Sequence, residues 1–146
     1  FKSFFAFSAL KNPPPLSFFR NFILEKEGGH TDRFDIKARA MMPLCDAARV
    51  LAYDHRQTGY ESTAGRYRLA ARQEPGKAGL FSEAAEAYEQ LVRLRATEGL
   101  GNSDSGRYVE VEKLGKMERQ NLKNIFKLIG EVQQLLRVRY RTDFLG

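Results

Sequence analysis

Residues 34–52 read FDIKARAMMPLCDAARVLA, a charged segment followed directly by an apolar one. Residues 34–40 alternate between apolar and charged side chains, as in a half-buried strand, although they also fit one face of a helix. Pro43 favours the extended form, because the residue before a proline is pushed out of the α region and proline suits the first helical turn. We therefore expect an extended or irregular segment, followed by a helix from about Met42 to His55.

The helix expected after the proline would bury one stripe of its surface. The stripe consists of Leu44, Ala48, Leu51 and His55, with Cys45 and Ala52 beside it. Asp46 and Arg49 are three residues apart and can form an ion pair. Such charges either build a site or only solvate a surface, and the sequence leaves both interpretations open. Cys45, on the apolar side, is interpreted as a buried, inert thiol.

The same kind of apolar periodicity predicts helices elsewhere in the chain. The other helical patterns occupy residues 1–11, 16–25, 64–73, 83–98 and 117–141. Ser62 or Thr63 is the expected cap of the 64–73 helix, Ser82 that of the next helix, and Gly99 its left-handed end. Residues 99–112 are predicted to be loop. The fold class is therefore all-α, a bundle of about six helices with one short extended segment near residues 34–40.

Length and composition set the broad class of the protein. The 146 residues suit one domain, so residues 1–146 are expected to form a single helical accessory domain. No apolar run is long enough to span a membrane. The single cysteine excludes an internal disulfide, and a cytoplasmic location is the default expectation. The chain begins with Phe1 rather than Met, which suggests a fragment of a longer protein.

The positive charge is concentrated late in the sequence. The net charge is +6, and residues 107–146 hold nine Lys/Arg against five Asp/Glu, a net of +4. This bias indicates either a solvated basic face or attraction to a phosphate-bearing ligand or an acidic neighbour. A nucleic-acid-binding protein usually has a denser basic stripe, so nucleic acid is disfavoured as a partner.

The chain shows no recognisable catalytic motif. Two separated histidines and one cysteine do not supply a metal site. No phosphate-binding loop or dinucleotide fingerprint is present. Phosphoryl transfer needs carboxylates that hold a divalent metal, and the two Glu-x-Glu pairs, at 25/27 and 110/112, are interpreted as solvated. We therefore expect no catalysis by this chain alone and no cofactor within it.

Several motifs, spread over most of the chain, resemble those of a known family. They are residues 15–19 (PLSFF), 35–37 (DIK), 43–52 (PLCDAARVLA), 94–95 (LR) and 117–123 (MERQNLK), with Gln133 downstream. Their order and spacing resemble the putative nucleotidyltransferase substrate-binding domain family. Residues 60–66 depart from the resemblance, because the family tends to have Asn-Thr there.

The resemblance implies an accessory role beside an enzyme. Such domains follow a nucleotidyltransferase catalytic domain in bacterial signal-transduction proteins, which often also carry cystathionine-synthase-type and cyclic-nucleotide-binding domains. Mg and a nucleoside triphosphate are then expected only in the neighbouring catalytic domain, and a protein acceptor is a further candidate partner. The candidate substrate-binding residues are Asp35, Lys37, Arg39, Asp46, Arg49, Arg95 and Arg119.

A structural or regulatory module is the alternative interpretation. The N-terminal segment contains Phe4, Phe5 and Phe7, and exposed apolar patches mark interfaces. On this interpretation the domain would mediate interdomain contact or form a homodimer.

Overall fold

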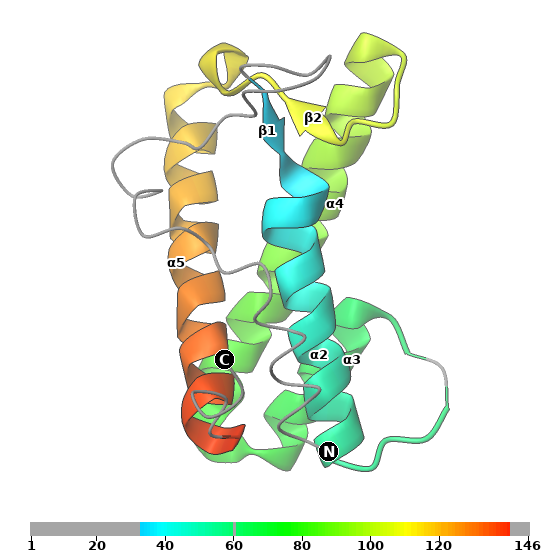
Figure 1. Ribbon diagram of the computed structural model, residues 1–146, viewed down its shortest axis with the longest axis vertical. Coiled ribbons are helices and arrows are strands. Elements are labelled where there is room, and N and C mark those ends of the chain that lie inside the picture. The colour runs from blue at the N-terminus through cyan, green and yellow to red at the C-terminus, as the bar shows by residue number, and fades with distance from the viewer. Residues whose placement is uncertain (1–32, 60, 141–146) are drawn as a thin grey trace.

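A computed structural model of the chain describes residues 33–59 and 61–140, and its main elements are helices (Figure 1). In chain order they are β1 (Phe34–Asp35), a π-helical turn (Lys37–Met41), α2 (Met42–Asp54), α3 (Thr63–Gln73), a 3-10 turn (Pro75–Lys77), α4 (Ala78–Asn102), β2 (Tyr108–Val109), a 3-10 turn (Val111–Lys113) and α5 (Lys116–Tyr140). The all-α class is confirmed, but the six-helix bundle is not: the described part of the chain has four helices and one small sheet. The helices expected at 1–11 and 16–25, together with Phe4, Phe5 and Phe7, lie outside the described residues.

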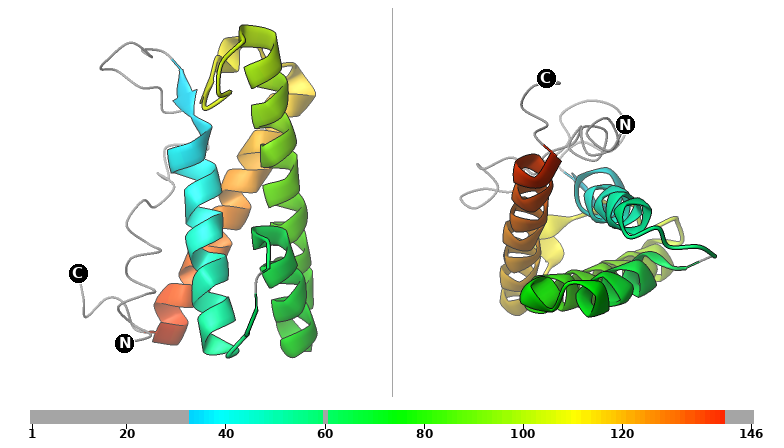
Figure 2. Two further views of the ribbon diagram at one scale, coloured as in Figure 1. Left: turned by 90° about the vertical axis from the view of Figure 1, so that its right-hand side faces the viewer. Right: turned by 90° about the horizontal axis from the view of Figure 1, so that it is seen from below.

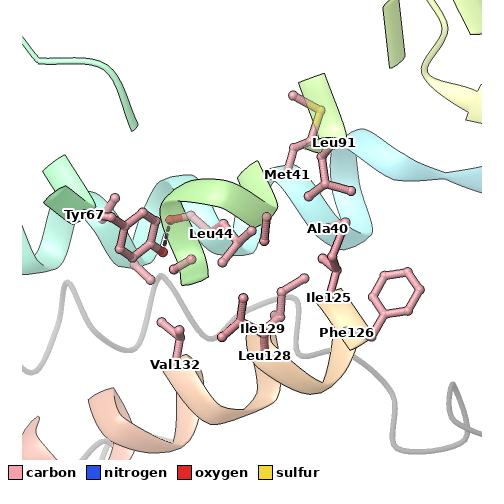
Figure 3. Packing of buried hydrophobic residues seen from close by; sticks show 14 of the residues in the cluster. Ala40, Met41, Leu44, Tyr67, Leu91, Ile125, Phe126, Leu128, Ile129 and Val132 are labelled. Carbon is pink, nitrogen blue, oxygen red and sulfur yellow. Dashed lines mark hydrogen bonds between the residues drawn. The ribbon is translucent and has the colours of Figure 1, made fainter. Parts of the chain in front are cut away.

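The three long helices α2, α4 and α5 form a triangle when viewed along their axes, and α3 packs against α4 and α2 (Figure 2). Their inward faces supply the core, which includes Leu44, Leu91 and Ile129 (Figure 3). The buried Tyr67 of α3 donates a hydrogen bond from its hydroxyl to the Leu44 carbonyl at 2.6 Å. This buried hydrogen bond joins α3 to α2 and gives the tyrosine hydroxyl a partner within the apolar core.

Three of the four described helices agree with the sequence prediction to within one residue at each end. Helix α2 begins at Met42 and ends at Asp54, and Leu44, Ala48 and Leu51 are buried as expected. The Ser62 hydroxyl accepts a hydrogen bond from the Gly65 N–H at 3.0 Å, which makes it the cap of α3. These helices follow their predicted bounds because capping and apolar periodicity are local properties of the sequence.

For the helix predicted at residues 83–98, which is α4 in the structure, both predicted ends were wrong. Helix α4 begins at Ala78, because the 3-10 turn after Glu74 leads directly into it, and Ser82 lies exposed within the helix. At its other end Ser103, with φ +55°, takes the left-handed conformation that was expected of Gly99. Gly99 is instead buried in the helix, where an added Cβ would lie 2.8 Å from the Asp104 carbonyl oxygen. The glycine is therefore needed for close packing of the following loop.

The predicted extended segment before α2 is extended only at Phe34 and Asp35. These residues pair antiparallel with Val109 and Tyr108, inside the region that was expected to be loop. From Lys37 the chain forms a π-helical turn, in which the Met42 N–H donates to the Lys37 carbonyl. A proline ring clashes with the carbonyl four residues before it, and we infer that the wider π turn relieves this clash at Pro43.

Candidate functional site at the start of α2

The π turn is anchored by a buried carboxylate. Asp35 is 5% exposed, and both of its oxygens accept hydrogen bonds from the Arg107 guanidinium, at 3.0 and 3.1 Å from Nε and 2.8 Å from Nη2. Its Oδ1 also accepts the Ala38 N–H at 3.0 Å. Asp35 therefore joins the π-helical turn to Arg107, the residue before β2, across 72 residues of sequence.

This environment lowers the pKa of the Asp35 carboxyl. Burial opposes ionisation of the carboxyl, but the hydrogen bonds from Arg107 and Ala38 and the charges of Arg107 and Arg39 together hold its pKa below the usual value. Asp35 is thus an ionised group with its acceptor sites already in use. Its partner Arg107 also lies over the Tyr108 ring, with its Cζ 5.2 Å from the ring centroid.

The π turn itself carries the two candidate cations, Lys37 and Arg39, and both side chains are half-buried. The sequence alternation placed Asp35, Lys37 and Arg39 on one side of an extended chain, but residues two apart on a helix do not face each other. The turn therefore separates the two cations around its axis. π-Helical turns are rare and are frequently found at functional sites, so this turn is the candidate functional site.

Asp46 and Arg49 form the expected ion pair on the surface of α2. The Arg49 Nη1 lies 3.3 Å from the Asp46 Oδ1, and the Arg49 side chain is 60% exposed. Burial raises the pKa of the Asp46 carboxyl above its usual value, and Arg49 opposes the rise. The Thr63 hydroxyl donates to the Cys45 Sγ at 3.5 Å beside this pair, so the thiol lies at the contact between α2 and α3.

Arg95 and Arg119 hold loops with their guanidinium groups. The Arg95 Nε donates to the Ser105 carbonyl at 3.0 Å, on the loop after α4. Arg119 donates to three carbonyls of the segment before α5, those of Val111, Glu112 and Leu114. The two arginines belong to α4 and α5 rather than to the segment that begins α2, and each holds a backbone segment in place. Their role in binding a substrate stays a prediction.

Three basic residues with well-defined positions in the structure were not among the predicted site residues. Arg107 was assigned to a loop, and no local spacing connects it to Asp35. Lys116 and Lys123 line a cavity with Arg119 on the first turns of α5. Their seven-residue spacing, which places them on one helix face, was the signal that could have found them.

The opposite end of the bundle holds a second, partly buried ion cluster. Glu74, after α3, accepts two hydrogen bonds from the Arg139 guanidinium, at 2.6 and 2.9 Å, and contacts the His55 Nε2 at 2.7 Å. The Arg139 hydrogen bonds lower the pKa of Glu74, burial opposes them, and His55 adds to the lowering. This cluster joins the ends of α2, α3 and α5 and is interpreted as structural.

Residues 33–59 and 61–140 contain neither a cluster of metal-binding side chains nor a membrane-spanning helix. No three His, Cys, Asp or Glu side chains there lie close enough together to hold a metal ion. Among the same residues, every helix is too short or too polar to cross a lipid bilayer.

A family comparison covers almost the whole chain. The family described as "Putative nucleotidyltransferase substrate binding domain" matches residues 1–140. The chain belongs to this family. The family's description is that of a substrate-binding rather than a catalytic domain, in agreement with the expectation that the chain is not catalytic alone. Searches of the curated proteins and of the solved structures found no match to this member of the nucleotidyltransferase substrate-binding domain family.

Proposed function

We propose that this domain packs beside the nucleotidyltransferase catalytic domain of a bacterial signal-transduction protein and helps to bind that enzyme's substrate. The family match over residues 1–140 carries the proposal. The catalytic carboxylates, Mg and the nucleoside triphosphate belong to the neighbouring domain, and this chain contributes a rigid helical wall and a small number of fixed cations. A protein acceptor and a cytoplasmic location are part of the proposal.

The π turn is the element with which the domain would contact the substrate. Lys37 and Arg39 sit on a turn that the Asp35–Arg107 ion pair fixes in place. Arginine offers a planar fork and lysine a point charge, and both suit a phosphate or carboxylate group. Because Asp35 is already used to hold the turn, we assign it a positioning role and assign binding to the two cations.

The test uses a protein that contains both the catalytic domain and this chain. Lys37→Ala and Arg39→Ala should each raise the KM for the substrate, or lower turnover, by about tenfold, the effect of removing one hydrogen bond to a charged group. Lys77→Ala removes an exposed charge from the 3-10 turn at the other end of the bundle and is the matched control. Unchanged KM and turnover in both π-turn variants would remove these residues from the site.

A second candidate function is a structural or regulatory module that makes interdomain or dimer contacts. It is favoured by two large apolar side chains at the same end of the bundle, Leu100 of α4 at 85% exposure and Met117 of α5 at 87%. Sedimentation of the chain separates the two functions. A dimer that Leu100→Glu and Met117→Glu convert to a monomer, without loss of nucleotide transfer in the two-domain protein, would favour the structural module.

A further inference from the structure

Helices α4 and α5 form a groove between them, which we call the α4–α5 groove. Its floor is apolar and consists of Leu91, Leu94, Leu122 and Ile125, and its volume is 250 Å³. The two helices make one side of the triangle seen along the bundle (Figure 2). Small-molecule sites have volumes of roughly 300–1,000 Å³, so the α4–α5 groove suits a protein segment better than a small ligand.

Exposed apolar side chains continue the groove toward the end of the bundle where the two strands pair. Leu100 follows the lining residue Thr97 by three positions on α4, and Met117 precedes the lining residue Asn121 by four positions on α5. Residues three or four apart lie on one face of a helix, so each of these side chains extends a wall of the groove. From Gln90 to Leu100 the α4 wall is about 15 Å long, which is enough for about three turns of a docked helix.

The same end of the groove is acidic. Glu118 lines the groove, and Glu98, one helical turn after the floor residue Leu94, is half-buried on α4. Burial raises the pKa of the Glu98 carboxyl, and the negative charges of Glu118, Glu110 and Asp104 add to the rise. Two carboxylates that repel each other therefore lie beside an apolar floor.

The hydrogen bonds described for these two carboxylates come from neutral donors. A hydrogen bond from Asn102 opposes the rise in the pKa of Glu98, and Glu118 accepts the Gly115 N–H at 3.4 Å. A neutral donor satisfies a carboxylate oxygen but does not cancel its charge as a cation would. The acidic end of the groove therefore favours a positively charged side chain from a partner.

The other end of the groove carries the opposite charge. Arg93 lines the groove five residues before Glu98, which is about 7.5 Å along the α4 axis. An apolar floor with a negative end and a positive end distinguishes the two directions in which a helix can lie in it. Complementary charges at such a surface select the partner and fix its register.

We propose that the α4–α5 groove docks an amphipathic helix of the neighbouring catalytic domain, with a Lys or Arg of that helix placed at Glu98 and Glu118. An acidic residue about one turn away on the same helix would face Arg93, and the apolar face between them would cover Leu100 and Met117. This inference rests on the proposed function, in which the domain packs beside a catalytic domain, and it names the face that makes the contact.

The experiment compares hydrogen exchange in this chain alone and in a protein that contains both the catalytic domain and this chain. We expect the amides of residues 90–100 and 117–125 to exchange about tenfold more slowly in the two-domain protein, because the docked helix must leave before these segments open. Thr97→Arg places a bulky side chain in the groove and Glu118→Lys reverses its charge, so each should remove most of this difference.

Lys127→Glu is the matched control. Lys127 is exposed and lies nine residues, or two and a half turns, after Glu118, so it is on the opposite face of α5. The variant reverses a charge on the same helix and should leave the exchange difference within about twofold of that in the natural protein. Thermal unfolding of each variant in the chain alone separates lost docking from lost folding.

Three outcomes would overturn the proposal. They are equal exchange of the groove segments in the two proteins, an exchange difference that Thr97→Arg and Lys127→Glu reduce equally, and protection in the chain alone that grows with its concentration. The last result would assign the groove to a second copy of this chain.

Failure here is distinguishable from failure of the proposed function, because the π-turn variants are tested by transfer and the groove by exchange. Equal exchange in the two proteins, together with a raised KM in Lys37→Ala, would reject the docking groove and leave the proposed function standing. A protected groove with unchanged KM and turnover in Lys37→Ala and Arg39→Ala would reject the substrate role and leave the docked helix standing.

Discussion

Replacing Asp35 with alanine should lower the free energy of unfolding by about 3 kcal/mol, and the contacts of its carboxylate give this figure. The Ala38 N–H bond is equivalent to a helix cap, which contributes about 1 kcal/mol. Breaking a buried ion pair by removing one partner costs about 3–5 kcal/mol, but the Arg107 side chain is 37% exposed, so we discount this contribution to about 2 kcal/mol. The two contributions together give the expected loss of about 3 kcal/mol in the free energy of unfolding.

The assay is urea unfolding followed by circular dichroism, with a double-mutant cycle. Arg107→Ala leaves the buried Asp35 carboxylate without its cation, and combining it with Asp35→Ala should cost about 2 kcal/mol less than the sum of the single variants. Asp46→Ala removes a carboxylate from the exposed pair with Arg49 and is the matched control, with an expected loss below about 1 kcal/mol. A loss below about 1 kcal/mol for Asp35→Ala, or strict additivity in the cycle, would refute the reasoning.

The pH dependence gives an independent check on the same carboxylate. The folded-state pKa of Asp35 is depressed, so its contribution is complete above the unfolded pKa of about 3.9 and is lost as the pH falls through the lower folded value. Asp35→Asn keeps an acceptor for the Ala38 N–H but has no charge to lose. The stability difference between the natural chain and Asp35→Asn should therefore narrow below about pH 4, and a constant difference would show that the charge contributes nothing.

Three further predictions concern other parts of the fold. Tyr67→Phe should cost about 0.5–1.5 kcal/mol in urea unfolding, because it removes the hydrogen bond that the buried hydroxyl adds to the Leu44 carbonyl of α2, and an unchanged free energy of unfolding would contradict the role of this bond. Ser62→Ala should cost about 1 kcal/mol through the lost cap of α3, whereas Ser62→Asp should restore most of that stability; equal losses would argue against capping. Glu74, whose pKa Arg139 lowers, should contribute stability above its unfolded pKa of about 4.3 and lose it as the pH falls through its folded value. Glu74→Gln should accordingly be less stable at neutral pH and lose less on acidification, and parallel pH profiles of the two proteins would contradict this prediction.

The candidate site was predictable in part. The charged residues at the start of α2 were identified from their pattern, and the Asp46–Arg49 pair was identified from its spacing. The arrangement of Lys37 and Arg39 was not, because alternation in sequence fits an extended chain and a helix equally well before tertiary contacts choose between them. Pro43 favoured the extended form, but the π turn accommodates the proline within a continuous helical path.

The sequence by itself determined the all-α class, the apolar stripe of α2, the cap of α3 and the bounds of α5 to within one residue. These features depend on interactions between residues at most four apart, so they leave a periodic pattern. Only the tertiary structure decided the β1–β2 pairing, the true ends of α4 and the anchoring of Asp35 by Arg107. Each of these features depends on contacts between segments that pack together in space. A contact between residues far apart in the chain, such as the one between Asp35 and Arg107 across 72 residues, leaves no periodic pattern in the sequence.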